Sequence, residues 1–207
     1  MSSASTPSPA ARARVLAHRP LVRSLQRAYS AERAASLAYI GHAASLRDPA
    51  AKARIKAIEQ DEWDHRRHVL GILQHYGIPV SRRFEIQYYW IGQVIAASCH
   101  VIGWFMPYFF AGKLESGNVC EYFVMMRHFR SLGIREHDAV LYEMGMKEKE
   151  HEIYFLAQVE QSRLLPWFEK VFAWGRARSR NDVDLERKYA LEDGPLYCPR
   201  QGGGSAR

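Results

Sequence analysis

The chain has 207 residues, of which 47% are hydrophobic and 25% are charged. This composition is typical of a soluble globular chain and excludes a wholly disordered protein, a collagen and a multi-span membrane protein. The three cysteines lack metal-ligand spacing, which excludes a zinc ribbon. The formal net charge of +7 suits a phosphate-rich partner, either nucleic acid or an anionic membrane surface, and equally a solubilising tail.

The two ends of the chain differ in composition from its middle. Residues 1–19 are rich in Ser, Ala, Pro and Arg and contain no acid, which predicts a flexible basic arm or an organellar transit peptide. A second basic run covers residues 176–180, and Gly and Pro recur after residue 194. We therefore expect three parts: the arm at 1–19, a helical bundle at 20–165, and a short helix with a disordered tail at 166–207.

Gly and Pro are sparse between these ends and cluster where helices should stop. No strand-like alternation bounded by hairpin turns competes with the helical pattern. The sequence therefore predicts an all-α antiparallel bundle with a short extra C-terminal helix. Its predicted helices cover 21–46, 50–75, a region at 84–132 interrupted near Pro107, Gly112 and Gly117, a helix from 134 to 164, and a shorter one from 166.

Residues 86–112 contain no charged side chain and eight aromatic ones. The length would permit a transmembrane helix, but Pro107 and several polar residues weigh against one. We expect a core helix followed by an elbow that faces lipid, because Trp and Tyr favour the membrane interface. The alternative is an apolar wall that dimerisation buries.

Two Glu-x-x-His motifs lie on predicted helices, at Glu62 to His65 and at Glu148 to His151. At this spacing both side chains leave one face of the helix, so a carboxylate and an imidazole can converge on one ion. A di-iron carboxylate bundle needs two such motifs and one further Glu from each of the other two helices. One motif alone would be weak evidence, whereas two on separate helices indicate a metal site.

Two further acids, Glu32 and Glu121, lie at matching distances from the turns and could complete the metal site. Glu32 lies about 24 Å before the first turn and Glu62 about 21 Å after it, so the two should face each other across an antiparallel pair. Glu121 and Glu148 match in the same way around the second turn. The apolar surroundings of Glu121 make an unpaired carboxylate costly there, and a metal ion would be its partner.

The predicted ligands are four carboxylates and two imidazoles. Hard carboxylates with imidazoles suit iron or manganese better than a metal that seeks thiolates, and four carboxylates offset most of the charge of two divalent ions. A metal-bound His normally donates its other N–H to a carboxylate, for which Asp61 and Asp64 are candidates. The predicted ligand set is Glu32, Glu62, His65, Glu121, Glu148 and His151.

These motifs, with Tyr39 to Ala43 after the first Glu, resemble the demethoxyubiquinone hydroxylases, ferritin-like di-iron proteins of ubiquinone biosynthesis. The likeness covers about residues 20–160, and the uncharged stretch before Glu121 resembles that family's membrane-associated segment. A His-Tyr pair of the family is replaced here by His128-Phe129, so this chain would be a divergent branch acting on another quinone or lipid.

The resemblance implies a ferritin-like bundle that holds two iron ions and uses O2 to hydroxylate a quinone ring, with electrons from NADH or a reductase. By position it implies the six ligands above, with Glu62 and Glu148 as bridges. It further implies peripheral contact with the inner membrane through 86–112, on the cytoplasmic side, or in mitochondria if the source is eukaryotic. A homo-oligomer and a lipid-binding partner protein are also expected.

Three alternatives stay open from the sequence. The same metal centre would serve a ferritin-like tRNA hydroxylase, although the uncharged aromatic segment argues against a nucleic-acid partner. It would also serve a ferroxidase or a peroxidase of the rubrerythrin kind, without the rubredoxin-like iron site. The third alternative is not an enzyme: a helical membrane adaptor without metal, in which the Glu and His residues are ordinary surface or salt-bridged groups.

Overall fold

The structure is a computed structural model that describes residues 7–172, and the basic run at 176–180 lies outside them. The described residues form helices without any strand, which confirms the predicted all-α class. The elements are α1 (Pro9–Ala17), α2 (Arg19–Ser45), α3 (Pro49–Tyr76), α4 (Arg82–Ser98), α5 (Phe105–Ser131), α6 (Asp138–Val159) and α7 (Leu165–Phe172).

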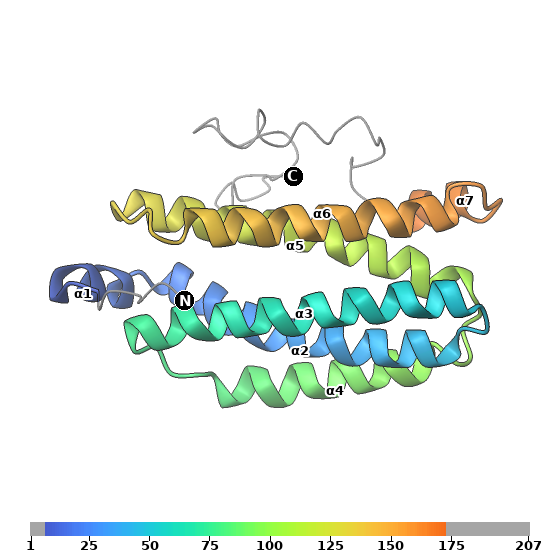
Figure 1. Cartoon of the computed structure of the whole chain (residues 1–207), viewed down its shortest axis with the longest axis horizontal. Coiled ribbons are helices and arrows are strands. Elements are labelled where there is room, and N and C mark those ends of the chain that lie inside the picture. Colours follow the sequence, from blue (N-terminus) through green and yellow to red (C-terminus); the bar gives the residue numbers. More distant parts are fainter. Residues whose placement is uncertain (1–6, 173–207) are drawn as a thin grey trace.

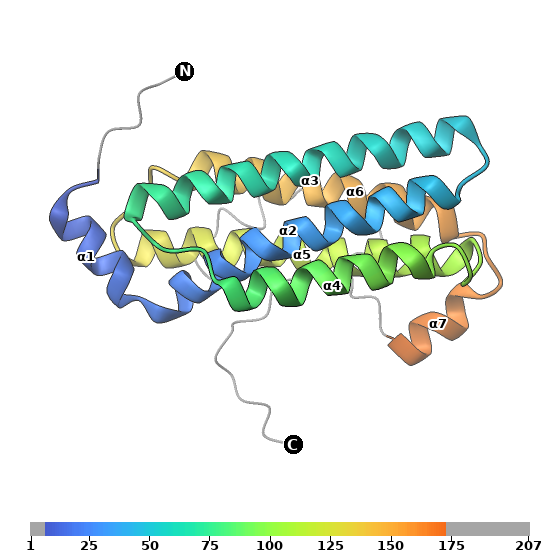
Figure 2. The same cartoon turned by 90° about the horizontal axis from the view of Figure 1, so that it is seen from below.

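Helices α2, α3, α5 and α6 form a four-helix bundle (Figure 1). Two antiparallel hairpins, α2–α3 and α5–α6, pack side by side, and α4 connects them by running back along the outside of α2 (Figures 1 and 2). This crossover is necessary because α3 ends at the opposite end of the bundle from the start of α5. Two hairpins joined by one long crossover are the topology of ferritin-like bundles.

Local sequence signals explain where the helices of the first hairpin begin and end. Asp48 caps α3, because its carboxylate accepts a hydrogen bond of 2.6 Å from the N–H of Ala51, and Pro49 follows in the first turn. Gly77 ends α3 in the left-handed conformation, with φ of 66°, which a residue with a side chain would adopt only with strain. Ser81 then caps α4 by accepting from the N–H of Phe84.

The N-terminal arm contains a helix, which the sequence did not predict. Residues 9–17 form α1, whose Val15 side chain is fully buried in the core. Arg12 donates a hydrogen bond of 3.0 Å to the backbone carbonyl that ends α3, and Arg14 one of 3.1 Å to the carbonyl that follows α5. The expectation of a flexible arm over 1–19 is therefore wrong for 9–17, because one apolar contact and two long side chains hold this segment on the bundle.

Of the predicted interruptions of the third region, the one near Pro107 is present a few residues earlier, whereas those near Gly112 and Gly117 are wrong. The break lies at residues 99–104, and α5 continues through Gly112 and Gly117. Pro107 stands in the first turn of α5, where a backbone N–H has no partner within the helix, so it starts the helix without breaking it. Glycine inside a helix costs about 1 kcal/mol, which the packing of α5 in the bundle outweighs.

Helix α4 is held close to α2 by small residues and by a partly buried network of ion pairs and hydrogen bonds around Glu85. A Cβ on Gly41 would lie 2.4 Å from the Cα of Ala96, so only glycine permits this approach. Glu85 of α4 accepts from Ser30 at 2.7 Å and from Arg66 of α3 at 2.8 Å. These contacts tie the crossover to both helices of the first hairpin.

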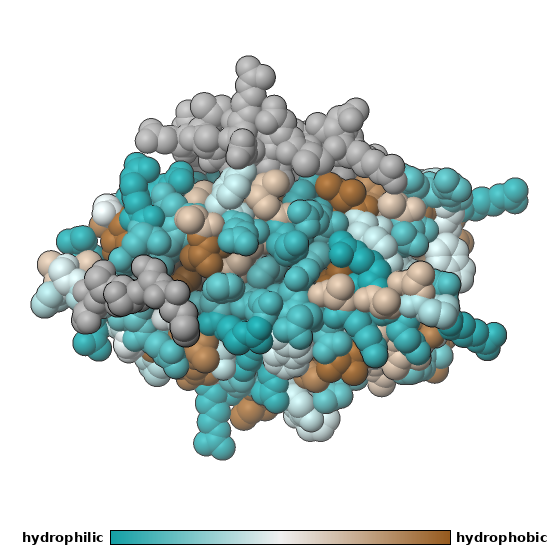
Figure 3. All heavy atoms as spheres, viewed as in Figure 1, coloured by the Kyte–Doolittle hydropathy of each residue, from teal (hydrophilic) through white to brown (hydrophobic). Residues whose placement is uncertain are grey.

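The uncharged segment 86–112 is divided between surface and core. Its α5 part is buried, whereas α4 exposes Ile86, Trp90 and Val94 and the following turn exposes Val101 and Trp104. Apolar atoms accordingly reach the surface in patches along the edge formed by α4 (Figure 3). The elbow is thus exposed as expected, but the core helix follows it and does not precede it. Among the described residues no helix is long and apolar enough to cross a membrane.

Two apolar cores occupy the two ends of the bundle. One contains Leu25, Tyr76 and Phe129, and the other contains Ile55, Phe109 and Phe155. The acids and histidines of the predicted metal site lie on the bundle helices between these cores. The fold therefore surrounds a short polar layer with packed hydrocarbon, where an unpaired charge is costly.

Candidate metal centre

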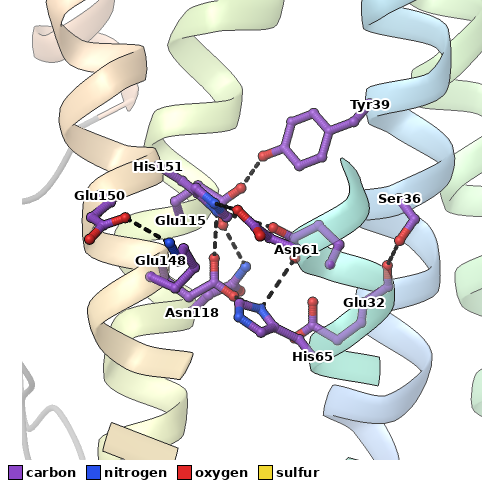
Figure 4. A network of polar contacts seen from close by, with 12 residues as sticks. Glu32, Ser36, Tyr39, Asp61, His65, Glu115, Asn118, Glu148, Glu150 and His151 are labelled. Atoms are coloured by element: carbon purple, nitrogen blue, oxygen red, sulfur yellow. Dashed lines mark hydrogen bonds and ion pairs between the residues drawn. The ribbon is translucent and has the colours of Figure 1, made fainter. Parts of the chain in front are cut away.

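Each helix of the bundle contributes at least one buried acid to this polar layer (Figure 4). Six ionisable side chains that meet here are at most 4% exposed, and their ligand atoms converge between the helices. They are Glu32 from α2, Glu62 and His65 from α3, Glu115 from α5, and Glu148 and His151 from α6. Five of them were predicted from the sequence, and Glu115 was not.

The side chains form two overlapping clusters, in each of which four ligand atoms lie within 4.8 Å of one another. The Glu32 cluster consists of Glu32, Glu62, His65 and Glu148, and the Glu115 cluster consists of Glu62, Glu115, Glu148 and His151. Both clusters contain Glu62 and Glu148. A carboxylate has two oxygens, so these shared glutamates can bridge two ions.

Each imidazole lies closest to the shared glutamate of the other hairpin. Nδ1 of His65 lies 3.0 Å from Oε1 of Glu148, on the other hairpin, and 3.9 Å from Oε2 of Glu62. Nδ1 of His151 lies 3.2 Å from Oε1 of Glu62 and 3.5 Å from Oε2 of Glu148. Both histidines therefore aim the same ring nitrogen at the centre of the layer.

Apart from the His–Glu ion pairs just described, the atoms that face this centre form no hydrogen bond within residues 7–172. They are Oε2 of Glu32, both side-chain oxygens of Glu62 and of Glu148, and Nδ1 of His65 and of His151. Buried polar atoms in folded proteins are almost always hydrogen-bonded, and leaving one unpaired costs about 1–3 kcal/mol. Seven such atoms converging on one place fit metal ions as the missing partners. Oxygen and imidazole donors suit iron or manganese.

Without metal ions, protons on Glu32, Glu115 and His151 would offset the negative charge of the buried layer. Burial raises the pKa of the Glu32 and Glu115 carboxyls well above the ordinary value, and the neighbouring glutamates of α3 and α6 raise it further. Burial opposes the charged form of His151, but the carboxylates around it outweigh this and raise its pKa to about 12. Divalent cations would replace these protons, because metal ligands must be deprotonated.

Two tyrosines hold the outer carboxylates in a crossed arrangement. The hydroxyl of Tyr39 on α2 donates to Glu115 on α5, and the hydroxyl of Tyr122 on α5 donates to Glu32 on α2. Burial and the adjacent carboxylate raise the pKa of both phenols, so both remain neutral donors. Each tyrosine stands seven residues after the glutamate of its own helix, on the same face.

Two further side chains support the Glu115 cluster. Oδ2 of Asp61 lies 3.0 Å from Nε2 of His151, and Nδ2 of Asn118 donates a hydrogen bond of 2.9 Å to Oε2 of Glu115. A carboxylate on the far nitrogen of a ligating His fixes the ring orientation and makes the ligand more basic. Of the two acids considered for this role, Asp61 has it and Asp64 does not. Asp64 forms an ion pair with Arg67 at the surface.

The prediction that Glu121 faces Glu148 is wrong. Glu121 lies outside both clusters, where one of its oxygens pairs with Arg27 at 3.0 Å and accepts from Ser24 at 3.3 Å. The apolar neighbours seen in the sequence pack on other faces of α5. Glu121 therefore has a cation as its partner, on the outer side of α2.

Glu115 and Glu121 lie at similar distances along the bundle from the level of Glu148. The direction in which each side chain leaves α5 therefore explains why the prediction of Glu121 was wrong. The rings of Phe129 and His137 pack 4.7 Å apart on either side of Gly133, so the α5–α6 turn is centred near that glycine. Glu148 then lies at the height of position 118, which is three residues from Glu115 and equally three from Glu121. Six residues turn a helix by about 600°, which leaves these two side chains about 120° apart.

A repeat in the sequence could have identified Glu115. Glu32 is followed by Tyr39, and Glu115 is followed by Tyr122 at the same spacing, just as the two Glu-x-x-His motifs repeat. Each hairpin thus carries Glu-x6-Tyr on its first helix and Glu-x-x-His on its second. Glu121 has no tyrosine at the corresponding position, which is His128.

We compared the chain with models of protein families, with curated proteins and with solved structures, and none of them matches. The structure and the sequence motifs are therefore the basis for assigning a function. They define an all-α bundle with buried Glu and His clusters that are consistent with a di-iron site.

Proposed function

We propose that the protein is a non-haem di-iron oxidoreductase that hydroxylates a quinone-like aromatic ring with O2. The convergence on one buried layer of seven ligand atoms from α2, α3 and α6 that form no hydrogen bond to any described residue, beside the Glu115 carboxylate of α5, carries this proposal. Glu62 and Glu148 would bridge the two ions, Glu32 and His65 would complete one site, and Glu115 and His151 the other. A bound ferrous pair supplies the electrons that reduce and activate O2.

The polypeptide contributes an environment that suits this chemistry. The two apolar cores that flank the layer limit the access of water, which protects reactive oxygen chemistry from side reactions. Tyr39 and Tyr122 keep the outer carboxylates in place as hydrogen-bond acceptors. NADH or a reductase would have to return two electrons in each cycle, because hydroxylation incorporates one oxygen atom and reduces the other to water.

The exposed apolar face of α4 supports a substrate that is delivered from a membrane. Ile86, Trp90 and Val94 are each more than half exposed, and Trp104 in the following turn is 59% exposed. Exposed Trp beside aliphatic side chains favours the lipid–water interface. We therefore propose that α4 and its elbow lie on a membrane surface, where a lipid quinone would be available.

Metal content is the test of the central proposal. After anaerobic reconstitution with ferrous iron, we expect about two irons per chain in the wild type, as the two clusters imply. Glu148→Ala removes a ligand common to both clusters, so it should lower the content towards zero. The matched control is Glu150→Ala, since Glu150 lies on the same helix and pairs with Lys147 at the surface. The proposal fails if the wild type binds no iron, or if both variants retain it.

A second experiment addresses the substrate. Iron-loaded protein, with a chemical reductant, is given a membrane-borne demethoxyquinone in lipid vesicles, and hydroxylated product is measured by mass spectrometry. Trp90→Ser and Trp104→Ser should lower vesicle binding and turnover while iron content is unchanged. Unchanged vesicle binding would contradict the lipid-surface proposal and leave the metal centre standing.

A further inference from the structure

A row of arginines lies on one face of the first half of α2. Arg19, Arg23 and Arg27 follow one another at intervals of four residues, which places them one above another along the helix. They line a surface cavity of about 770 Å³ together with Arg83 from the first turn of α4. The same three α2 arginines line an adjoining hollow of about 380 Å³. We call these two hollows the arginine groove.

The positive charge of the arginine groove is poorly balanced. No Asp or Glu lines either hollow. Arg27 is paired with Glu121, but within residues 7–172 no acid forms an ion pair with Arg19, Arg23 or Arg83. The nearby Glu85 is engaged by Arg66 and Arg33 between the helices. Concave surfaces with one sign of charge focus the electrostatic potential and attract ions of the opposite sign.

The groove also has an apolar side, which restricts the anion that it fits. Phe84 and Tyr88 of α4 line it beside the guanidinium groups. Arg83 shares the outward face of α4 with Ile86, Trp90 and Val94, because these positions follow it at intervals of three, seven and eleven residues. The charged groove therefore continues directly into the exposed apolar face of α4. A ligand with a phosphate group at one end and hydrocarbon at the other matches both parts.

We propose that the arginine groove binds the phosphate of anionic phospholipid headgroups while the apolar face of α4 contacts the acyl region. Guanidinium groups form charge-assisted, often bidentate hydrogen bonds to phosphate oxygens. The lipid source of the phosphate rests on the membrane contact proposed above, whereas the groove itself is independent of the metal centre. It makes membrane binding selective for lipid charge, which an apolar face alone would not do.

The experiment measures binding of full-length protein to vesicles at low salt. Phosphatidylcholine vesicles are compared with vesicles that also contain phosphatidylglycerol. We expect Arg19→Gln, Arg23→Gln and Arg83→Gln, combined in one variant, to weaken binding to the anionic vesicles by about 100-fold, or roughly fivefold for each arginine. Binding to phosphatidylcholine alone should change little.

A matched control separates the groove from overall charge. Arg47→Gln, Arg135→Gln and Arg163→Gln remove the same net charge from exposed positions that line neither hollow. The proposal is overturned if this control weakens binding as much as the groove variant does, or if neither variant weakens it. Equal circular dichroism spectra and iron contents of the three proteins would show that folding and the metal centre are unaffected.

Inorganic phosphate distinguishes the two sources of the ligand. Calorimetric titration with phosphate should show weak binding to the wild type at most, because a single small anion gains nothing from the apolar side of the groove. Tight binding of phosphate that the groove variant loses, together with unaltered vesicle binding, would assign the groove to a soluble phosphate compound and overturn the lipid assignment.

Discussion

The two hairpins of the bundle carry the same ligand pattern but support it differently. In each, a Glu-x6-Tyr helix is followed by a Glu-x-x-His helix, and the tyrosines cross to hold each other's glutamate. Asp61 stands one residue before the α3 motif and reaches His151, whereas the corresponding residue before the α6 motif is Lys147, which pairs with Glu150. His65 therefore has no equivalent of the Asp61 carboxylate.

The outer glutamates also differ in support, since Glu115 accepts more hydrogen bonds than Glu32. Glu115 accepts hydrogen bonds from both Tyr39 and Asn118, whereas Glu32 accepts from Tyr122 through one oxygen and its other oxygen has no hydrogen-bond partner among the described residues. The position that corresponds to Asn118 on α2 is Ala35. The Glu115 cluster is thus the more rigidly held of the two. A symmetric set of ligands here has an asymmetric set of supports, so the two metal positions are expected to differ in affinity.

The largest effect is expected from removing Glu115, the ligand that the structure identifies, in comparison with removing Glu121, the ligand that the sequence suggested. Glu115→Ala removes a carboxylate from the Glu115 cluster, and we expect the affinity for one of two metals to fall by more than the roughly 10- to 100-fold that loss of an outer partner costs. Glu121→Ala breaks only the pair with Arg27 and should leave metal content unchanged. Ferrous iron titration of both variants measures this, and the opposite result would restore Glu121 as a ligand.

Removing the support of His151 should have the next largest effect. Asp61→Asn keeps the shape of the side chain but removes the negative charge beside Nε2, so the affinity of the Glu115 cluster should fall by about 10- to 100-fold and approach that of the Glu32 cluster. Asp64→Asn is the control, since Asp64 is a surface partner of Arg67 on the same helix. A two-step titration curve in the wild type that becomes a single step in Asp61→Asn would bear out the asymmetry, and identical curves would contradict it.

The smallest expected effect is on the pH dependence of folding stability, and it concerns His42, a titratable residue that the second hairpin lacks at the corresponding position. His42 stands ten residues after Glu32, and the residue ten after Glu115 is Met125. His42 is 2% exposed and its Nε2 has no hydrogen-bond partner within the described residues, so burial lowers its pKa to about 4. Below the ordinary pKa of about 6.5 the unfolded chain binds a proton that the folded chain does not, and stability falls with decreasing pH.

We therefore expect His42 to cost about 1–2 kcal/mol of unfolding free energy between about pH 7.5 and about pH 5. His42→Met makes the two helices alike at this position and should remove that part of the pH dependence. Urea unfolding of both proteins at the two pH values gives the difference. His68→Met, at an exposed position on α3, should leave the pH dependence as it is, and an equal response of the two variants would exclude His42 as the cause.

Most of the bundle could be predicted from residue types and spacing. Asp48-Pro49 and Gly77 mark the ends of helices through local hydrogen bonding and backbone geometry, which depend on few neighbours. The two Glu-x-x-His motifs place their ligands on one face because helix periodicity is the same in every helix. By contrast, α1 has a local start signal in Ser8-Pro9, where Ser8 accepts a hydrogen bond from the N–H of Ala11, but its position on the bundle depends on contacts with the distant ends of α3 and α5.

The sequence by itself determined the two hairpins of the bundle, the two motifs and the buried acid on α2, because each follows from periodicity within one segment or from a count across a short turn. The tertiary structure decided between Glu115 and Glu121, for which the repeated Glu-x6-Tyr spacing was the one signal in the sequence, and it brought Asp61 to His151. Both depend on the rotation of one helix about its axis against another. That rotation is set by packing over the whole interface, as in the contact of Phe123 with Tyr142, and not by any local signal.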